Sequence, residues 1–425
     1  MIITKRLVGK AIATWLGPTG DAARRAVRRF TDPARRLDLY FDIADPHSYL
    51  AAQIAKRLVA AYGVELGFTV VTPPASDVDS HPAMREKHSV RDAQALAEFY
   101  DLDFPGKREA DPGAVRDVGT SLVRERPALE QLDAALEFGA ALWANDRKQI
   151  TKLLGKYGAE AHGAVSPILN AAYAELRKAG HYKAGMFHFA GEWYSIDRIA
   201  YLERALGEEK HVVRERTDRA PRPLSDKPLV CDMWISFRSP YSYLALEQID
   251  PVLGDVPLAL HPVLPLVARG AQMPRTKLMY IMRDAKREAD RLAIPFGEMC
   301  DPLGDGVANC IAIAYWAEQR GRLAPFVRSA MRAIWSEARD MAEYVDLRYV
   351  VERAELPWAE AREQLGKPEA TKWANGNAAD LAVIGLWGVP SFRIGDFVTW
   401  GQDRIPLLVD RLRRHEIARE AVSAT

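Results

Sequence analysis

A serine followed by a proline at the start of an expected helix is the first candidate for chemistry. Ser239 and Pro240 come directly after an apolar run that ends at Phe237. Serine caps helices, and proline is favoured at their first position. The free N–H groups and partial positive charge of such a helix end favour an anion, so the Ser239 hydroxyl could help to stabilise a thiolate. Taken alone, the pair is more often simply a structural helix start.

Two later segments carry residues that could complete such a site. Residues 388–392 (Gly-Val-Pro-Ser-Phe) place Pro390 directly before a short apolar strand, and residues 400–404 (Trp-Gly-Gln-Asp-Arg) precede the last helix. Gln402 and Asp403 could cap that helix or hold the ammonium and carboxylate groups of a ligand. Each segment is weak evidence alone, but the three together, in this order, indicate a binding site.

The chain contains an internal repeat. Residues 39–50 match 232–244, with Pro46 aligned to Pro240. Further matches follow in the same order and pair 90–93 with 282–285, 101–106 with 293–297, and 194–199 with 400–405. Because the separation changes little along each half, the repeat predicts two copies of one domain with small loop changes.

The repeat divides the chain into four expected parts. They are a basic arm at 1–36, a first domain at 37–206, a charged linker with three prolines at 207–228, and a second domain at 229–415. Prolines do not continue a helix and favour extended structure, which suits a linker. The 425 residues also exceed the ~250 to 300 at which single cores stop growing.

Both copies show the same order of expected elements. Each begins with a strand, a proline-started helix and a second strand, at 37–43, 46–62 and 65–71 and again at 229–237, 240–252 and 257–263. Helical periodicity follows, for example at 323–335 and 358–386, and then two short strands at 391–394 and 397–400 and a helix from Asp403. The first three elements predict parallel pairing.

This order is that of a thioredoxin-like domain with a helical lid. The expected fold class is therefore α/β, with two tandem thioredoxin-like domains that each carry a helical insertion. In such a fold Pro390 is cis and lies beside the start of the first helix, and the backbone of Val389 is free to pair with a peptide-like ligand.

The second copy resembles the 2-hydroxychromene-2-carboxylate isomerases and kappa-class glutathione transferases, relatives of the disulfide oxidoreductase DsbA. The resemblance spans 228–414 and rests on Ser-Pro-Tyr-Ser-Tyr-Leu-Ala (239–245), Gly-Leu-Trp-Gly-Val-Pro-Ser-Phe (385–392) and Trp-Gly-Gln-Asp-Arg (400–404). It implies that the serine replaces an attacking cysteine and interacts with the sulfur of glutathione. The other residues that it implies for glutathione binding are Val389, Pro390, Gln402, Asp403 and Asn309.

The implied activity is that of a glutathione-dependent isomerase. The thiolate adds to a conjugated double bond of an aromatic substrate, the resulting single bond rotates, and the thiol leaves again. The protein would lower the thiol pKa from ~8.5 and orient the substrate, with Trp316, Met331 and Trp335 as possible lid residues. The alternatives are a kappa-like transferase that stops at the adduct and a non-catalytic thioredoxin-fold binding protein.

The first copy departs from this pattern where the chemistry is expected. Asp45 stands where Ser239 stands, and Gly185-Met186 replace Val389-Pro390. Since a carboxylate would repel a thiolate, we expect one glutathione site per chain, in the second copy. Asp45 beside His47 could serve acid-base chemistry, but a helix-capping aspartate with a solvated histidine is the expected outcome.

Composition excludes several classes of protein. With 48% hydrophobic residues, 27% charged residues and a net charge of +1, the chain has no overall electrostatic case for binding nucleic acid. The three cysteines, Cys231, Cys300 and Cys310, form no Cys-x-x-Cys pair, which argues against a dithiol oxidoreductase or a zinc site and favours a cytoplasmic protein. The expected partner is a small electrophilic or aromatic molecule.

The first 36 residues carry nine basic and two acidic side chains. Gly9 and Lys10 interrupt the apolar stretch that a signal peptide would need. Weak contact of this arm with an anionic membrane surface is one interpretation. Docking of the arm on the more acidic remainder of the chain is the favoured one.

Overall fold

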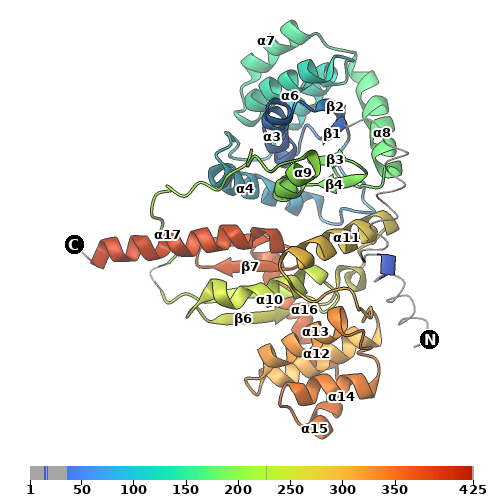
Figure 1. Ribbon diagram of the computed structural model, residues 1–425, viewed down its shortest axis with the longest axis vertical. Helices are drawn as coiled ribbons and strands as arrows, with labels where there is room; N and C mark the ends of the chain where they lie inside the picture. Colours follow the sequence, from blue (N-terminus) through green and yellow to red (C-terminus); the bar gives the residue numbers. More distant parts are fainter. Residues whose placement is uncertain (1–13, 16, 18–35, 226, 424–425) are drawn as a thin grey trace. The chain divides into compact units, whose positions relative to one another are not determined.

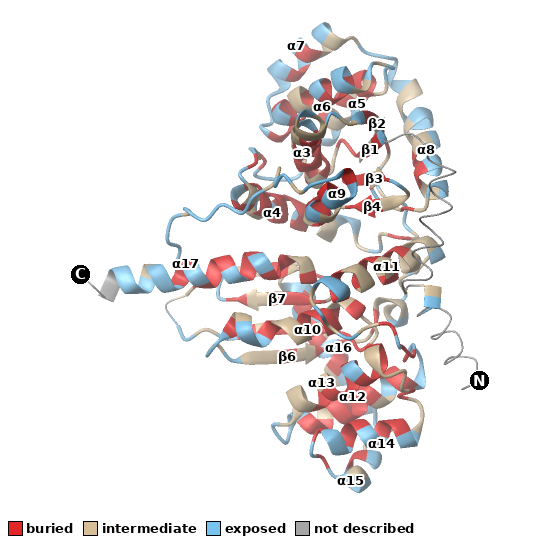
Figure 2. Ribbon diagram, in the orientation of Figure 1, coloured by how far each residue is buried: buried red, intermediate tan, exposed pale blue. Residues whose placement is uncertain are grey.

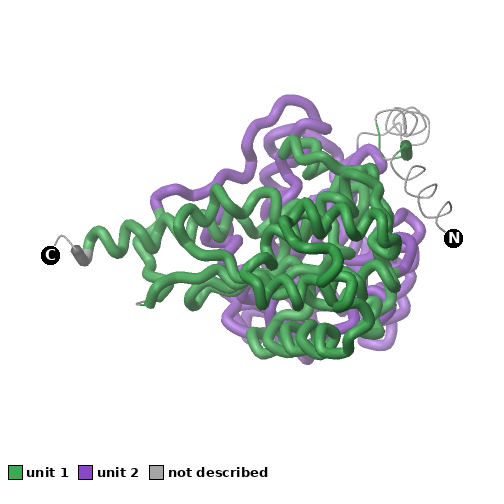
Figure 3. Tube along the Cα trace, turned by 90° about the horizontal axis from the view of Figure 1, so that it is seen from below, with its two compact units in different colours: residues 1–24, 219–273, 278–425 green, residues 25–218, 274–277 purple. Residues whose placement is uncertain are grey.

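A computed structural model describes residues 14, 15, 17, 36–225 and 227–423 (Figure 1). The chain divides into two compact units (Figure 3). Of the described residues from 36 onwards, the N-terminal unit comprises those up to Asp218 with Pro274–Lys277, and the C-terminal unit comprises those in Arg219–Met273 and from Leu278 onwards. The basic arm, with its possible membrane-surface contact, lies almost wholly outside the described residues. Within the described part, no helix is long and apolar enough to span a membrane.

The N-terminal unit contains a four-stranded sheet surrounded by helices. Its elements are β1 (Arg36–Phe41), α3 (Pro46–Tyr62), β2 (Glu65–Val70), α4 (Pro82–Tyr100), α5 (Pro112–Leu122), α6 (Ala128–Trp143), α7 (Arg147–Tyr157), α8 (His162–Lys178), β3 (Met186–Phe189), β4 (Glu192–Tyr194), η1 (Ile196–Arg198) and α9 (Ile199–Leu206). The strand order is β2-β1-β3-β4. β1 and β2 are parallel, and the other pairs are antiparallel.

The C-terminal unit repeats this arrangement. Its elements are β5 (Cys231–Ile235), α10 (Pro240–Leu253), β6 (Leu258–Pro262), η2 (Leu266–Arg269), α11 (Arg275–Arg291), α12 (Asp305–Glu318), α13 (Leu323–Ser336), α14 (Tyr344–Arg353), α15 (Trp358–Arg362), α16 (Pro368–Val383), β7 (Ser391–Ile394), β8 (Phe397–Trp400), η3 (Gln402–Arg404) and α17 (Ile405–Ser423). The order β6-β5-β7-β8, with β5 and β6 parallel, equals that of the other sheet. The expected α/β class with two thioredoxin-like sheets and helical insertions is confirmed.

One predicted helix is divided. The sequence predicts helical structure over 358–386, but α15 ends at Arg362 and α16 begins at Pro368. Between them Gly366 has a φ of +77°, which glycine adopts without steric cost, and Pro368 starts a new helix well but cannot continue one.

The C-terminal unit has a core of buried residues, to which β7, α12 and α13 contribute (Figure 2). Cys231, Met233 and Ile235 alternate along β5 and are buried in this core. The proposed lid residues Trp316, Met331 and Trp335 belong to the same buried cluster. They pack the helical insertion and do not line an open face, because an apolar side chain gains most by leaving water completely.

The segment predicted as a linker is packed at both ends. Glu203 Oε1 accepts hydrogen bonds from the N–H groups of Lys210 and Val212, both at 3.1 Å. Further along, Leu224 N donates to His415 Nδ1 at 3.1 Å. The first part of the segment is therefore joined to the N-terminal unit and the last part to the C-terminal unit.

Candidate functional site

The start of α10 is built as the sequence predicts. Ser239 has extended backbone angles, and its Oγ accepts a hydrogen bond from Ser242 N at 3.1 Å, with Pro240 in the first turn. Ser242 Oγ in turn accepts from Ser236 N at 3.4 Å, which ties the end of β5 to the helix. The Ser239 hydroxyl therefore lies at the positive end of the helix, where an anion is favoured.

A loop before β7 meets this helix start. The Val389–Pro390 peptide bond is cis, as expected. Ser239 Oγ lies 3.5 Å from the carbonyl oxygen of Val389, to which it can donate a hydrogen bond. The structure thus brings the serine hydroxyl and the Val389 backbone together from positions 150 residues apart.

The turn before α17 is connected to the same loop. Gly401 has a φ of +117°, and its N–H donates to the carbonyl of Pro390 at 2.9 Å. η3 packs against α10, so Gln402 and Asp403 lie close to the helix that Ser239 caps. Glycine is favoured at 401 because residues with a side chain rarely adopt this backbone angle.

Gln402 shows the most informative feature of this turn. The residue is only 4% exposed, and its Oε1 has no hydrogen-bond partner among the described residues. A buried amide oxygen without a donor costs about 1 to 3 kcal/mol, so such an atom calls for an explanation. A ligand that brings an N–H or ammonium group would satisfy it. Asp403, whose side chain is 29% exposed, lies 3.4 Å from Arg404 Nη1.

Close packing fixes the other side of the loop. A Cβ on Gly388 would lie 2.6 Å from Trp400 Nε1, so a side chain is excluded there. The Trp387 and Trp400 rings are in contact at 4.9 Å between centroids. Arg269 Nη2 donates to the Trp387 carbonyl at 2.9 Å. The Val389 backbone is therefore held by packing on both sides.

Asn309 is not joined to this group. It lies on α12, where Nδ2 donates to the carbonyl of Met341 at 3.0 Å. No hydrogen bond connects it with Ser239, Val389 or Gln402 within the described part of the chain. The structure brings together five of the six residues expected at the site, and the asparagine is engaged within the helical insertion.

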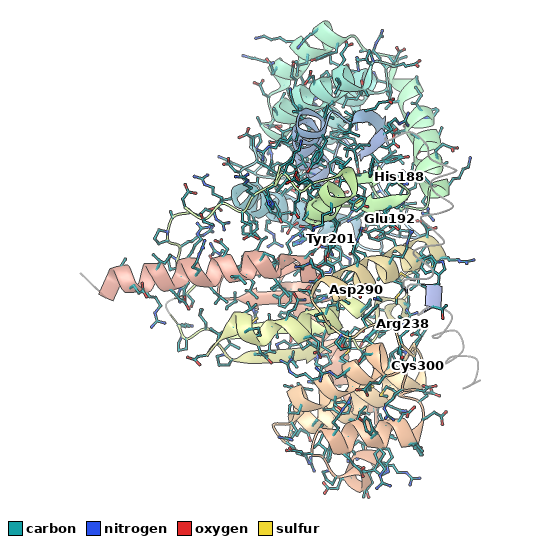
Figure 4. All side chains as sticks on the ribbon, viewed as in Figure 1. His188, Glu192, Tyr201, Arg238, Asp290 and Cys300 are labelled. Carbon is teal, nitrogen blue, oxygen red and sulfur yellow. The ribbon has the colours of Figure 1, made fainter. Side chains whose placement is uncertain are left out.

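Arg238 borders the site on the turn before Ser239 (Figure 4). Its Nε and Nη2 donate to the two carboxylate oxygens of Asp301, both at 2.8 Å. Cys300, which directly precedes Asp301, is buried, as are Cys231 and Cys310. Burial, with the nearby Asp232 charge, raises the pKa of Cys231 to about 12, and burial also raises that of Cys310. None of these thiols is placed to act as a nucleophile.

The corresponding helix start of the N-terminal unit holds a carboxylate. Asp45 caps α3 by accepting from His47 N at 3.2 Å, Ser48 N at 3.1 Å and Ser48 Oγ at 2.8 Å. A Cβ at Gly185 would lie 3.0 Å from Asp45 Oδ2. The aspartate therefore occupies the anion-favouring position itself.

His47 is not solvated as expected. Its side chain is 23% exposed; Nδ1 lies 3.3 Å from Asp45 Oδ1, and Nε2 lies 2.7 Å from Asp92 Oδ2. The expectation of a solvated histidine was wrong because the partner of His47, Asp92, is on α4, 45 residues away along the chain. This histidine joins two helices.

The titration of this group follows from burial and pairing. Burial disfavours both charged forms, but the mutual hydrogen bonds outweigh it, so the pKa of Asp45 falls to about 2 and the pKa of His47 rises to about 9. Burial and the Asp45 charge raise the pKa of Asp42 to about 7. Asp45 is thus charged at neutral pH and opposes a second anion.

Comparison with known proteins concerns the second half of the chain. Residues 230–413 match the family model of the DSBA-like thioredoxin domain. This segment is a DsbA-like thioredoxin domain. A 2-hydroxychromene-2-carboxylate isomerase of Pseudomonas putida is 23% identical over 198 residues, which cover 44% of this chain and 95% of that protein.

Solved structures that cover just under half of this chain are similar to it at low identity. A 2-hydroxychromene-2-carboxylate isomerase is 22% identical, with 46% of this chain and 99% of that chain covered and a TM-score of 0.39. The cytosolic disulfide reductase DsbM from Pseudomonas aeruginosa, in its structure with GSH, is 17% identical, with 46% and 99% covered and a TM-score of 0.33.

Two interactions around the DsbA-like domain were not predicted. Tyr241 Oη donates to Asp284 Oδ2 at 2.9 Å, and Arg238 is paired with Asp301. A signal for the first was present, because Tyr241 lies in the segment after Ser239 and Asp284 lies in another segment of the internal repeat. No local pattern marks the second pair.

Proposed function

We propose that the DsbA-like domain binds glutathione at Ser239 and acts as a glutathione-dependent isomerase. The substrate would be a conjugated aromatic molecule of the 2-hydroxychromene-2-carboxylate type. The observation that carries the proposal is the meeting of the Ser239 hydroxyl, at the positive end of α10, with the Val389 carbonyl on the cis loop, 3.5 Å away.

Each residue of the site has a distinct role in this proposal. Ser239 would turn its hydroxyl hydrogen from Val389 to the sulfur and, with the helix end, lower the pKa of the thiol. Val389 offers backbone groups for the cysteinyl residue. Gln402 Oε1, buried and without a partner among the described residues, would accept from the ammonium group of the γ-glutamyl end, with which Asp403 would also pair. Bound glutathione supplies a thiolate that adds to the double bond and later leaves.

The side chains at the helix starts favour isomerase over oxidoreductase chemistry. A dithiol enzyme needs a nucleophilic cysteine near the helix start, whereas this chain has Ser239 and Ser242 in one unit and Asp45 and Ser48 in the other. The buried cysteines provide no substitute. A glutathione transferase shares the thiolate step and differs only in releasing the adduct.

Calorimetric titration with glutathione tests the proposal. We expect one site per chain, and Ser239→Asp, which introduces the residue of the N-terminal unit, should abolish it. Asp45→Ser is the matched change in the N-terminal unit and should leave glutathione binding at Ser239 unaltered. Assays for isomerisation and for conjugation then separate isomerase from transferase. No binding at millimolar glutathione, or a stoichiometry near two, would contradict the assignment.

A further inference from the structure

Arg269, at the end of η2, is bound to the loop that carries the cis peptide bond. Its Nη2 donates to the carbonyl of Trp387 at 2.9 Å, and its Nε donates to the carbonyl of Leu264 at 3.1 Å. Its backbone N–H donates to the carbonyl of Pro265 at 3.2 Å. Backbone carbonyls therefore hold the guanidinium group against the loop, two residues before Val389.

No carboxylate of a described residue neutralises this guanidinium group. Burial lowers the pKa of Arg269, and no charge in the described part of the chain offsets that cost. Arg238, in contrast, pairs with both carboxylate oxygens of Asp301. A partly buried charge without a counter-ion is costly, and the planar fork of a guanidinium group matches a carboxylate. Arg269 is therefore suited to bind an anion.

The remaining donors of Arg269 are accessible to a ligand. The two carbonyls engage Nε and Nη2, and no described residue bonds to Nη1. The residue is also partly exposed, so an anion can approach it from solvent. Because the two carbonyls already fix the guanidinium plane, little side-chain entropy is lost when such an anion binds.

The place of Arg269 along the loop complements that of the η3 turn. The N–H of Gly401 binds the carbonyl of Pro390, one residue after Val389, whereas Arg269 binds Trp387, two residues before it. In the proposed function, the η3 turn receives the ammonium end of glutathione and Val389 pairs with the cysteinyl backbone. Arg269 lies at the other end of the loop, to which no ligand group has been assigned.

We propose that Arg269 binds a carboxylate of a ligand and makes the site selective for anionic ligands. The inference rests on the proposed function, since it completes the same site. Two groups have the required chemistry: the glycyl carboxylate of glutathione, and the carboxylate of an electrophile of the 2-hydroxychromene-2-carboxylate type. Arg269 acts on neither the sulfur nor the double bond, so its role is in binding and specificity.

Arg269→Gln tests the assignment, because it removes the charge but keeps an amide that can donate to a carbonyl. Calorimetry compares glutathione with its glycine ethyl ester, and steady-state kinetics compares kcat/KM of the electrophile with that of its methyl ester. We expect the parent to prefer at least one free acid over its ester about ten-fold, and Arg269→Gln to lose this preference. Arg269→Lys, which keeps the charge, should retain part of it.

The comparison of acid with ester separates recognition of a carboxylate from displacement of the loop. A displaced loop would weaken acid and ester alike, whereas loss of the charge weakens the acid alone. A preference lost for glutathione identifies the glycyl carboxylate as the ligand group, and one lost for the electrophile identifies the carboxylate of the electrophile.

Arg322→Gln is the matched control. Nε and Nη2 of Arg322 also donate to a backbone carbonyl, that of Ala354, at 3.2 and 2.9 Å, but its charge is paired with Glu355. This variant should keep the preferences of the parent. A parent without any preference for the acids, an unchanged preference in Arg269→Gln, or equal losses for acid and ester would overturn the inference. A parent chain that does not bind glutathione would instead refute the proposed function, and this is seen before any variant is compared.

Discussion

Ser239→Ala is the most direct perturbation of the proposed site. The Ser239 hydroxyl makes two interactions: it accepts from Ser242 N at 3.1 Å and lies 3.5 Å from the Val389 carbonyl. The first is the cap of α10. The second is long for a hydroxyl donor, so the hydroxyl can readily redirect its hydrogen bond to a bound thiolate. Alanine removes both without adding bulk.

The two effects differ in size. Loss of a hydrogen bond to a charged sulfur costs about 1.5 to 3 kcal/mol, which corresponds to a rise of about 1 to 2 units in the pKa of bound glutathione. At neutral pH the thiolate fraction, and with it the rate, should fall about 10- to 100-fold. Loss of the cap costs only about 1 kcal/mol of the free energy of unfolding, so the variant should remain folded.

Ultraviolet thiolate absorbance, followed as a function of pH with glutathione bound, measures the first effect. Steady-state isomerisation measures the fall in rate that follows from the higher thiol pKa. Asp146→Ala is the control for capping alone, since Asp146 caps α7 by accepting from Gln149 N at 2.9 Å. A thiol pKa and rate equal to those of the parent would show that the reasoning about Ser239 is wrong.

Three further predictions concern other parts of the chain. Replacing Cys231, Cys300 and Cys310 together should preserve turnover, and complete loss of activity in a folded triple variant, checked by circular dichroism, would restore a protein-thiol mechanism. The pKa of Asp42 is raised to about 7, because burial disfavours its charged form in the folded chain. The stability provided by the protonated form is therefore complete below pH 3.8 and is lost as pH rises through 7. Asp42→Asn, which cannot become charged, should stabilise the N-terminal unit at pH 8 by up to about 4 kcal/mol in urea unfolding, and by much less at pH 4. The pKa of His47 is raised to about 9, so the stability that it provides is present below pH 6.5 and lost as pH rises through 9; His47→Gln should flatten this part of the unfolding profile, and an unchanged profile would contradict the pairing.

Local sequence patterns predicted the secondary structure around the site well. Pro46 and Pro240 mark the starts of α3 and α10, and β7 and β8 have the predicted bounds. Ser239 and Pro390 are recognisable because capping and turn residues are specified by their immediate neighbours. The proximity of site residues that lie far apart in the sequence followed from the fold that these elements form.

Local sequence patterns could not predict the side-chain partners within the helical insertion. Asn309 is engaged by Met341, 32 residues away, and periodicity does not specify such a contact. Trp335 has the same large ring whether it packs a core or faces a cavity, and its burial is decided by neighbours from several helices. For His47, the partner lies on another helix, and only a comparison of the two halves of the repeat could have indicated it.

The packing of the segment between the units determines where the chain could be divided. Arg222 N donates to the carbonyl of Arg414 at 3.1 Å, Leu224 is buried and bound to His415, and Arg219 forms an ion pair with Asp410. A fragment that began at residue 229 would strip these partners from α17 and expose apolar surface. Separate expression of the two halves should therefore use a junction between Asp218 and Arg219, so that each fragment keeps the part of the segment on which it folds.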